Sequence, residues 1–340
     1  MPEGDAVRRL AETFAEVFAG QRCIVSSPQG RFAASAAILN GHLLVVCRAV
    51  GKHMFLGFST EEHAAEFRTY DSLSLQGQEI PERVDKWVHI HLGLYGWWRF
   101  NGDTTVKDYG HGVVHRVGPR DRHVPMRWGS GPLNAPAPQI PDPVENESWE
   151  VPEPIGQVRL RIVTTHAVAD LAGPHRCELV TDEERCLIES QLGPDPLAVA
   201  AHNNDEMCTR FVEAVRRRKR TIGEMLMDQS IIAGVGNIYR ADALFLAGIS
   251  PMRRGDRISV SRLQHLWHVV CEVMNRGLAA GYLITMSPDE APESVIEGDE
   301  EASRWYVYHR TGRPCIRCGT HIAEKLMNNR RLFWCPNCQR

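Results

Sequence analysis

Apolar residues near the start of the chain recur at steps of three and four positions. Leu10, Phe14 and Phe18 follow this spacing, and Gly20 stands where a helix could end. Such steps place side chains on one face of an α-helix. The pattern therefore predicts a single amphipathic helix over residues 3–19.

From about residue 22 to residue 100 the pattern changes to short apolar runs between glycines. Runs of this length, bounded by turn residues, are typical of β-strands. The clearest runs are residues 43–46, 53–56 and 87–92. We expect a further strand pair, 158–163 and 178–180, to close the same domain.

Helical spacing returns after Gly193. The candidate helices cover residues 197 to about 201, 207–220, 222–228, 238–247 and 260–276. The sequence thus predicts an α+β multidomain protein with a β-rich N-terminal domain, an all-α middle domain, an acidic loop and a C-terminal hairpin. These parts are placed at residues 1–185, 186–285, 286–302 and 303–340. Residues 101–156 are rich in Pro, Gly, His and Arg, show weak periodicity and are interpreted as an insertion in the first domain.

The overall composition is that of a globular protein, but its charge is segregated. The 340 residues are 43% hydrophobic and 24% charged, with a net charge of -3. Residues 287–302 carry seven acids and no base, which indicates a solvated loop, whereas residues 304–340 carry eight Lys/Arg against one acid. A nucleic-acid surface would therefore come from local charge and not from bulk basicity.

The chain has ten cysteines, and six of them show no disulfide-like spacing. This distribution favours a reducing compartment, such as the cytoplasm or nucleoid. The start, Met-Pro-Glu-Gly-Asp, lacks the charged and apolar regions of a signal peptide, and no apolar run is long enough to span a membrane.

The other four cysteines form two closely spaced pairs near the C-terminus. Cys315-x2-Cys318 is followed, after sixteen residues, by Cys335-x2-Cys338. Two such pairs can supply four thiolates to one tetrahedral Zn²⁺. Because thiolates would fill all four places, no position remains for a reactive water, and we expect one structural zinc ion. Its basic surroundings suit a phosphate backbone.

The N-terminus offers a possible nucleophile. Removal of Met1 would leave Pro2 with a free secondary amine, whose condensation with an aldehyde gives a permanently cationic iminium. Glu3 could serve as a proton donor or base, or could merely complement a helix dipole. Lys52 follows a glycine in the β-rich stretch, where it could face a substrate or be a solvated loop charge.

Two further segments could contact nucleic acid. Gly234-Val235-Gly236-Asn237 opens a predicted helix and could present N–H groups and an amide to a phosphate, with the basic stretch 216–220 flanking it. Residues 92–100 combine glycines with apolar and aromatic side chains, which could either wedge into a base stack or belong to the core.

Four motifs in order resemble the formamidopyrimidine-DNA glycosylase/endonuclease VIII family. They are Pro2-Glu3-Gly4, Gly51-Lys52, Gly234-Val235-Gly236-Asn237-Ile238-Tyr239, and the four-cysteine hairpin with Phe333-Trp334-Cys335-Pro336-x-Cys338. The resemblance covers about residues 2–100 and 157–340. It implies a β-sandwich N-terminal domain, a helix–two-turn–helix domain and a zinc-finger hairpin in a monomeric enzyme. Such an enzyme flips a damaged base out of DNA, excises it and cleaves the strand by β,δ-elimination.

The resemblance also implies roles for individual residues. Pro2 would be the nucleophile and Glu3 the proton donor, whereas Lys52 would assist β-elimination. Asn237, with Gly236, would bind a phosphate. Arg330 would bind phosphate and support δ-elimination, with the adjacent Arg331 as the alternative after a one-residue shift. Leu94 and Tyr95 would fill the space left by the flipped nucleotide.

Two features depart from the family pattern. Asp5-Ala6 stands where the family carries a further Pro-Glu, so Asp5 could replace that carboxylate, and the insertion 101–156 replaces a tight connection. The Pro-Glu-Gly, Leu-Tyr-Gly and Phe-Trp-Cys-Pro-x-Cys motifs favour the endonuclease VIII branch and oxidised pyrimidines. The alternatives are an enzyme specific for 8-oxoguanine and formamidopyrimidines, a catalytically silent zinc-dependent DNA-binding module, and a zinc-ribbon scaffold.

Overall fold

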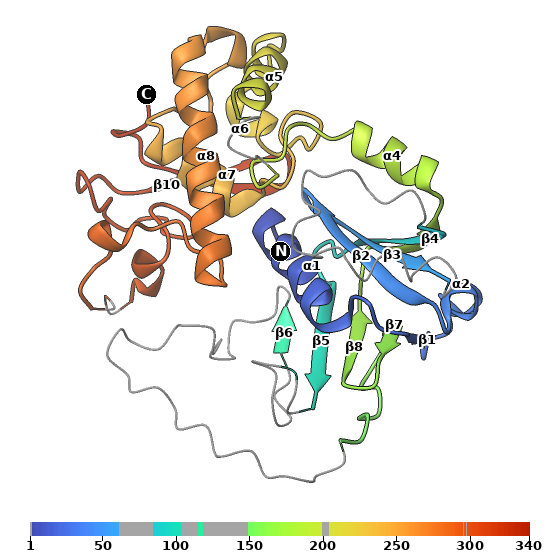
Figure 1. Cartoon of the computed structure of the whole chain (residues 1–340). Coiled ribbons are helices and arrows are strands. Elements are labelled where there is room, and N and C mark those ends of the chain that lie inside the picture. Colours follow the sequence, from blue (N-terminus) through green and yellow to red (C-terminus); the bar gives the residue numbers. More distant parts are fainter. Residues whose placement is uncertain are drawn as a thin grey trace. The chain divides into compact units, whose positions relative to one another are not determined.

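The computed structural model describes residues 2–60, 84–103, 106, 115–117, 149–198, 204–294, 296 and 298–340. The chain divides into two compact units. Unit 1 comprises Met1–Pro2 and Val7–Ile188, and unit 2 comprises Glu3–Ala6 and Glu189–Arg340. The division falls within the first helix, α1 (Gly4–Phe18), drawn in dark blue in Figure 1.

Unit 1 contains two antiparallel sheets. The four-stranded sheet has the order β2-β3-β4-β9, and the five-stranded sheet has the order β1-β7-β8-β5-β6. The strands of the first are β2 (Leu43–Val50), β3 (His53–Ser59), β4 (Lys86–His91) and β9 (Arg176–Val180). Those of the second are β1 (Ile24–Ser26), β5 (Trp97–Gly102), β6 (His115–Val117), β7 (Val158–Val163) and β8 (Ala167–Ala172).

One hydrophobic core joins both sheets to α1, which makes unit 1 the expected β-sandwich. Leu56 of β3, Ile90 of β4 and Leu160 of β7 are buried in this core. Phe14 of α1 packs edge-on against Trp98 of β5, with ring centroids 4.7 Å apart. The apolar stripe that predicted an N-terminal helix is therefore the face that covers the sandwich, and that prediction is confirmed.

Unit 1 differs from the sequence expectation in three places. Helix α2 (Ala33–Leu39) lies inside the stretch predicted as β, because its alanine-rich sequence favours helix. The predicted strands 158–163 and 178–180 do not pair: β7 pairs with β1 and β8, and β9 pairs with β4. Strand β8 was not predicted, because its three alanines and one aspartate have low β-propensity.

Most of the predicted insertion 101–156 lies outside the described residues. Within it, β6 pairs antiparallel with β5 and extends the five-stranded sheet.

Unit 2 is mainly helical. Its helices include α5 (Asn204–Arg216), α6 (Ile222–Met225), α7 (Asn237–Leu246) and α8 (Val260–Ala280). Helix α4 (Asp182–Ser190), which leads from β9 into this unit, was not predicted. The candidate helix starting at Leu197 is wrong where the structure describes it, because residues 196–198 form a turn and 199–203 lie outside the described part.

The acidic segment before the cysteine hairpin is partly folded into unit 2. Asp299 is buried and forms a two-oxygen ion pair with Arg310, which is also buried. Glu290 pairs with Arg317 and accepts a hydrogen bond from the Tyr306 hydroxyl. The prediction of a solvated loop is therefore wrong for Asp299, whereas Glu290 is exposed and anchors the segment through its two partners.

The C-terminal hairpin consists of β10 (Ala323–Met327) and β11 (Arg330–Trp334). Asn328 and Asn329 connect the strands, and both have positive φ angles (49° and 58°). Two successive residues of this kind are typical of the tight turn whose twist matches that of the strands. Within the described part of the chain, no helix combines the length and apolar character that crossing a membrane requires.

Candidate functional site

The carboxylate of Glu3 lies at the N-terminus of α7. One oxygen, Oε2, accepts the backbone N–H groups of Gly236 at 2.7 Å and Tyr239 at 3.4 Å, and Oε1 accepts that of Ile238 at 2.8 Å. Glu3 is 1% exposed. The first N–H groups of a helix have no partner inside it, so a carboxylate there satisfies three of them and is stabilised by the helix dipole.

The glycines of two distant motifs are explained by this contact. The Gly4 N–H donates to the Gly234 carbonyl at 2.9 Å, and a Cβ added to Gly4 would lie 2.8 Å from the Gly234 Cα. A Cβ added to Gly236 would lie 2.3 Å from the Glu3 carboxyl carbon. The Pro-Glu-Gly start and the Gly-x-Gly turn therefore form one packed structure that tolerates no additional atoms.

Asn237 and strand β11 lie beside the same helix end. The Asn237 side-chain amide donates to the Arg331 carbonyl at 2.9 Å, and its oxygen accepts a hydrogen bond from the Arg240 guanidinium. Arg240 also donates to the Arg331 carbonyl at 3.2 Å. Asn237 and the C-terminal hairpin are thus joined through the backbone carbonyl of Arg331.

The two candidate arginines of the hairpin differ in environment. Arg331 forms a two-oxygen ion pair with Glu324 at 2.5 and 2.6 Å, and its guanidinium lies 5.0 Å from the Phe333 ring centroid. Hydrogen bonds from Arg331 hold the pKa of Glu324 down at about 2. Burial lowers the pKa of Arg240, and the positive charge of Arg330 lowers that pKa further. Because successive side chains of a strand point to opposite faces, only one of the two can face α7.

The four cysteines of the two Cys-x2-Cys pairs form a cluster of possible metal ligands. Among the described residues it is the only cluster of this kind. Their sulfur atoms all lie within 4.8 Å of one another, with 3.9 Å between Cys315 and Cys338 and 3.5 Å between Cys318 and Cys335. Four Zn–S bonds of about 2.3 Å in a tetrahedron place sulfurs about 3.8 Å apart. Hydrogen bonds from Thr320 lower the pKa of the Cys318 thiol to about 5, which favours thiolate. The donor set therefore fits Zn²⁺.

Asp242 on α7 holds the segment before the hairpin. Its carboxylate accepts the backbone N–H groups of Tyr306, Val307 and Tyr308 at 2.9–3.1 Å, together with the Thr285 hydroxyl. Burial raises the pKa of Asp242, and these hydrogen bonds oppose that effect. This role of Asp242 could not be predicted from the sequence, because a lone Asp inside a helix has no local signature.

Asp5 is completely buried in unit 2 and lies near α8. A Cβ added to Gly277 would lie 2.2 Å from the Tyr239 hydroxyl and 3.2 Å from an Asp5 carboxylate oxygen. Gly277 therefore makes room for the Tyr239 and Asp5 side chains. The carboxylate that stands in the atypical position after Gly4 is thus enclosed by helices.

The other candidate residues belong to unit 1. Pro2 directly precedes Glu3 in sequence, and Lys52 ends the β2–β3 turn. Lys52 is 7% exposed, so the interpretation as a solvated loop charge is wrong. Leu94 and Tyr95 are 49% and 71% exposed on a turn between β4 and β5, which excludes the core interpretation for both. Trp98 and Phe100 from the same segment do belong to the core.

A group of histidines shares one face of the four-stranded sheet next to Lys52. His53 pairs with His91 across β3 and β4, and the Nδ1 of His53 lies 2.8 Å from the Nε2 of His89. Burial lowers the pKa of His53 to about 3 and those of His89 and His91 to about 4. The positive charges of Arg176 and Lys52 and the neighbouring imidazoles add to this effect, so the three rings are neutral near pH 7.

We therefore expect the stability of unit 1 to fall as the pH decreases from 7 to 5. The folded-state pKa values lie below the ordinary value of about 6.5, so the unfolded chain binds more protons in this range. Each imidazole should cost about 2 kcal/mol at pH 5 relative to pH 7. Urea unfolding at both pH values measures the loss. His89→Phe should reduce the pH dependence, His268→Gln on the exposed face of α8 should not, and equal slopes for all three proteins would contradict the explanation.

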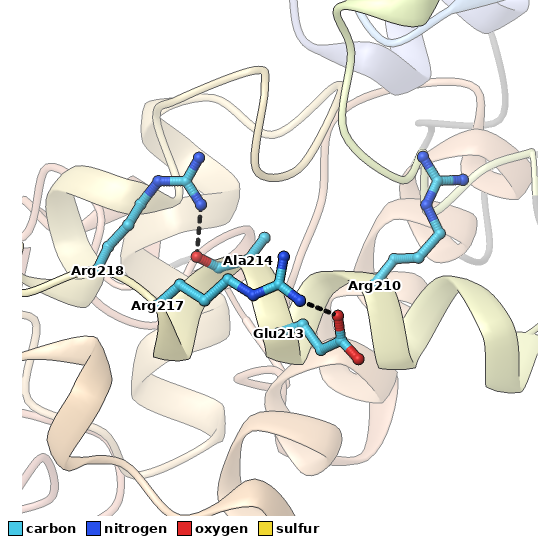
Figure 2. Close-up of a pocket in the computed structure, with 5 residues that line it drawn as sticks. All are labelled: Arg210, Glu213, Ala214, Arg217 and Arg218. Atoms are coloured by element: carbon cyan, nitrogen blue, oxygen red, sulfur yellow. Dashed lines mark hydrogen bonds and ion pairs between the residues drawn. The ribbon is translucent and has the colours of Figure 1, made fainter.

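The basic stretch 216–220 is only partly connected to the glycine turn. Arg220 forms an ion pair with Asp228 at 2.7 Å, just before that turn. Arg217 pairs with Glu213 on α5, and Arg218 donates to the Ala214 carbonyl at 2.6 Å. Figure 2 shows these side chains and Arg210 around a shallow hollow on the exposed face of α5. That face is cationic but contributes no side chain to the Glu3–Asn237 arrangement.

The comparisons with known proteins agree with these geometric observations. Residues 192–288 match the formamidopyrimidine-DNA glycosylase H2TH domain, and residues 312–340 match the zinc finger found in FPG and IleRS. The protein named endonuclease 8 1 from Mycobacterium tuberculosis (strain H37Rv) is 34% identical over 339 residues, which cover 100% of both chains. Formamidopyrimidine-DNA glycosylase from Stenotrophomonas maltophilia (strain K279a) is 38% identical over 152 residues, 44% of this chain and 52% of that protein.

Solved structures show the same fold. A structure of MutM in complex with DNA containing carbocyclic 8-oxo-G has a TM-score of 0.63 at 18% identity, covering 100% of both chains. Lactococcus lactis formamidopyrimidine-DNA glycosylase, non-covalently bound to DNA containing an AP site, gives 0.64 at 18% identity over 99% of both chains.

Proposed function

Because the chain belongs to the formamidopyrimidine-DNA glycosylase/endonuclease VIII family of base-excision-repair glycosylases and AP lyases, we propose that it removes oxidised bases, preferring pyrimidines, through a Pro2 iminium. Its partner is damaged DNA, from which the target base is flipped before excision. Strand cleavage by β,δ-elimination follows from the same covalent intermediate. The pyrimidine preference rests on the sequence motifs of the endonuclease VIII branch.

The observation that supports this proposal most strongly is the position of Glu3. Its carboxylate is fixed by three backbone N–H groups at the start of α7, so the residue bonded to Pro2 cannot swing freely. A nucleophile and a proton-transfer group on adjacent residues need this kind of fixed geometry.

The proposed reaction begins when the Pro2 nitrogen attacks C1′ of the damaged nucleotide. The nitrogen loses its proton as the N–C1′ bond forms. The base departs with the electron pair of its bond to C1′ and takes up a proton from solvent, and the sugar ring then opens at O4′. Glu3 takes up a proton and returns it to O4′, which leaves a cationic iminium. Loss of a C2′ proton then expels the 3′ phosphate, and a second elimination expels the 5′ phosphate. Lys52 assists the first elimination.

Asn237 and Arg330 are proposed to bind the phosphate beside the lesion. Asn237 is the first residue of α7, and its side-chain NH₂ group can donate to a phosphate oxygen. Arg330 is preferred over Arg331 because it stands five residues before Cys335, where the family carries its hairpin arginine. Leu94 and Tyr95 are proposed to fill the vacated space in the duplex, which their exposure permits. One zinc ion would hold the hairpin in shape.

Borohydride trapping on DNA with an abasic site tests the nucleophile. The wild-type enzyme should form a covalent complex, and protein whose N-terminal Pro2 nitrogen is blocked as an amide, by acetylation or a retained N-terminal extension, should form almost none, because an amide nitrogen is not nucleophilic. Arg9→Gln, which changes a polar residue of α1 in unit 1, is the control. Trapping that survives blocking of the Pro2 nitrogen would place the nucleophile elsewhere, and no trapping by the wild type would refute the proposed function.

The base specificity is tested separately with a panel of lesions in single- and double-stranded DNA. Thymine glycol and 5-hydroxycytosine should be excised faster than 8-oxoguanine. The partial match to a formamidopyrimidine-DNA glycosylase, over 44% of this chain, makes purine lesions the second candidate. Faster excision of 8-oxoguanine would favour that candidate without affecting the iminium mechanism.

Arg330→Ala should change the product pattern on an abasic site. Loss of the phosphate contact should leave β-elimination and reduce the δ-product about 10-fold, because one hydrogen bond to a charged group contributes about 1.5–3 kcal/mol. The ratio of products is read from the mobility of the cleaved ends on a gel. Arg331→Ala is the matched neighbour and should leave this ratio nearly unchanged; the opposite result would show that Arg331 holds the phosphate.

A further inference from the structure

Arg240 is a buried cation at the centre of the unit 2 arrangement. It is 1% exposed, although it lies on the first turns of α7. Its guanidinium donates to the Asn237 side-chain oxygen, to the Arg331 carbonyl at 3.2 Å and to the Gly223 carbonyl at 3.3 Å. One side chain therefore connects α6, the first residue of α7 and strand β11.

The charge of Arg240 has no ion-pair partner among the described residues. A buried arginine is normally paired, since burying an isolated charge is costly. Burial accordingly lowers the pKa of Arg240 to about 10, with Glu3 raising it and Arg330 lowering it further. Its Nε is buried and has no hydrogen-bond partner. The positive charge of Arg240 is therefore held by neutral carbonyl and amide oxygens.

We propose that Arg240 is a positioning residue that fastens β11 to the N-terminus of α7, so that Asn237 and Arg330 engage the same phosphodiester together. This inference rests on the proposed function, because the phosphate site that Arg240 supports is part of that function. Arg240 itself does not touch the DNA, since its side chain is enclosed.

The hydrogen bonds explain how Arg240 orients Asn237. By donating to the amide oxygen, Arg240 fixes which end of the Asn237 amide is NH₂ and directs that end toward the Arg331 carbonyl. One N–H of the amide is used there, and the other remains available for a phosphate oxygen. Without Arg240, the amide could flip and present its oxygen, which would repel a phosphate.

The same contacts explain how Arg240 acts on Arg330. The carbonyl of Arg331 accepts hydrogen bonds from both Asn237 and Arg240, so the backbone beside Arg330 is held at two points. The planar guanidinium can reach three acceptors at once, whereas a lysine ammonium is a single point on a flexible stem. The attachment of the preceding segment to α7 is provided separately by Asp242. Loss of Arg240 should therefore loosen the site without detaching the hairpin.

A double-mutant cycle on abasic-site DNA tests the proposal. Arg240→Gln and Asn237→Ala should each raise KM about 10-fold, since each removes contacts of about 1.5 kcal/mol. If Arg240 acts through Asn237, the double variant should remain near 10-fold and not approach the product of about 100-fold. Arg240→Lys should recover only part of the loss. The proposal would be overturned if the effects of the two substitutions on KM multiply to about 100-fold in the double variant. A wild-type KM for Arg240→Gln would also overturn it.

A matched control separates positioning from general loss of stability. Arg262 also uses its guanidinium to hold carbonyls in unit 2, those of Gly248 and Arg340, but it touches none of the site residues. Arg262→Gln should combine multiplicatively with Asn237→Ala. Zinc content and urea unfolding are measured for every variant, and if Arg240→Gln does not fold, the cycle is completed with Arg240→Lys. Failure of wild-type trapping would refute the proposed function; normal trapping with a multiplicative cycle would refute only the role of Arg240.

Discussion

Gly236→Ala is expected to destabilise unit 2 by about 3 kcal/mol and to reduce base excision by at least about 100-fold. The added Cβ would lie 2.3 Å from the Glu3 carboxyl carbon and 2.6 Å from both of its oxygens. Overpacking of this kind in a closed structure costs about 1–3 kcal/mol. Displacement of Glu3 also breaks its hydrogen bonds to the start of α7. The residue bonded to the proposed nucleophile then loses its fixed position, so activity falls more than stability.

The decisive measurement is the free energy of unfolding in a Glu3→Ala background. Truncation of Glu3 removes the atoms that the new Cβ would strike, so Gly236→Ala should then cost less than about 1 kcal/mol. Excision should stay low in the double variant, because the proton-transfer group is absent. Val235→Ala in the same turn is the control, since Val235 is buried and its truncation adds no atom beside Glu3. An equal cost in both backgrounds would show that Gly236 is required for another reason.

This contact illustrates how much of the site could be predicted from the sequence. The Pro-Glu-Gly start, the Gly-x-Gly-Asn turn and the cysteine pairs were all identified, and the family assignment that they suggested is confirmed. The sequence could not indicate that Glu3 occupies the helix N-terminus created by the glycine turn, more than 200 residues later. Local patterns identify residues, whereas contacts between distant segments depend on the tertiary fold.

The residues that were interpreted wrongly or missed share a physical cause. A solvated charge was one of two interpretations of Lys52, because lysine is seldom buried, yet the fold encloses this side chain. Leu94 and Tyr95 could equally have belonged to a core, because an apolar run does not reveal which face is covered. Arg240 and Asp242 are ordinary residues of a helix by composition. The buried hydrogen bonds of Arg240 arise where β11 packs against α7, and those of Asp242 arise where the segment before the hairpin packs against the same helix.

The fold itself was predictable where periodicity was strong. The amphipathic stripe of α1 and the long helix α8 were recognised, since each repeats an apolar contact over several turns. Helix α4 was missed because it is mostly polar and only one of its residues, Arg185, is buried, with its guanidinium 4.9 Å from the Trp87 ring centroid. Such a helix is stabilised by a few tertiary contacts and leaves little periodic signal.

Removal of zinc is expected to unfold the C-terminal hairpin and abolish β,δ-elimination. The hairpin has only a small apolar cluster, which includes Ile322 and Phe333 together with two of the cysteines. A segment of this size cannot fold by burial alone, and structural zinc contributes about 10–16 kcal/mol in comparable fingers. Without the metal, thiolates would repel one another, β11 would leave α7, and Arg330 would no longer be held beside Asn237.

Treatment with a zinc chelator, followed by limited proteolysis and an abasic-site cleavage assay, measures this effect. The protease should cut the metal-free protein first between residues 312 and 340, and scission of the DNA strand should be lost. Added Zn²⁺ should restore both the resistance to protease and the strand scission. Cys335→Ser should resemble the chelated protein, whereas Cys271→Ser on α8, outside the cluster, should not. A metal-free protein that still gives the δ-product would contradict a structural role for zinc. Because the metal contributes no reacting group in this proposal, a loss of scission without unfolding of the hairpin would argue instead for zinc in the chemistry itself.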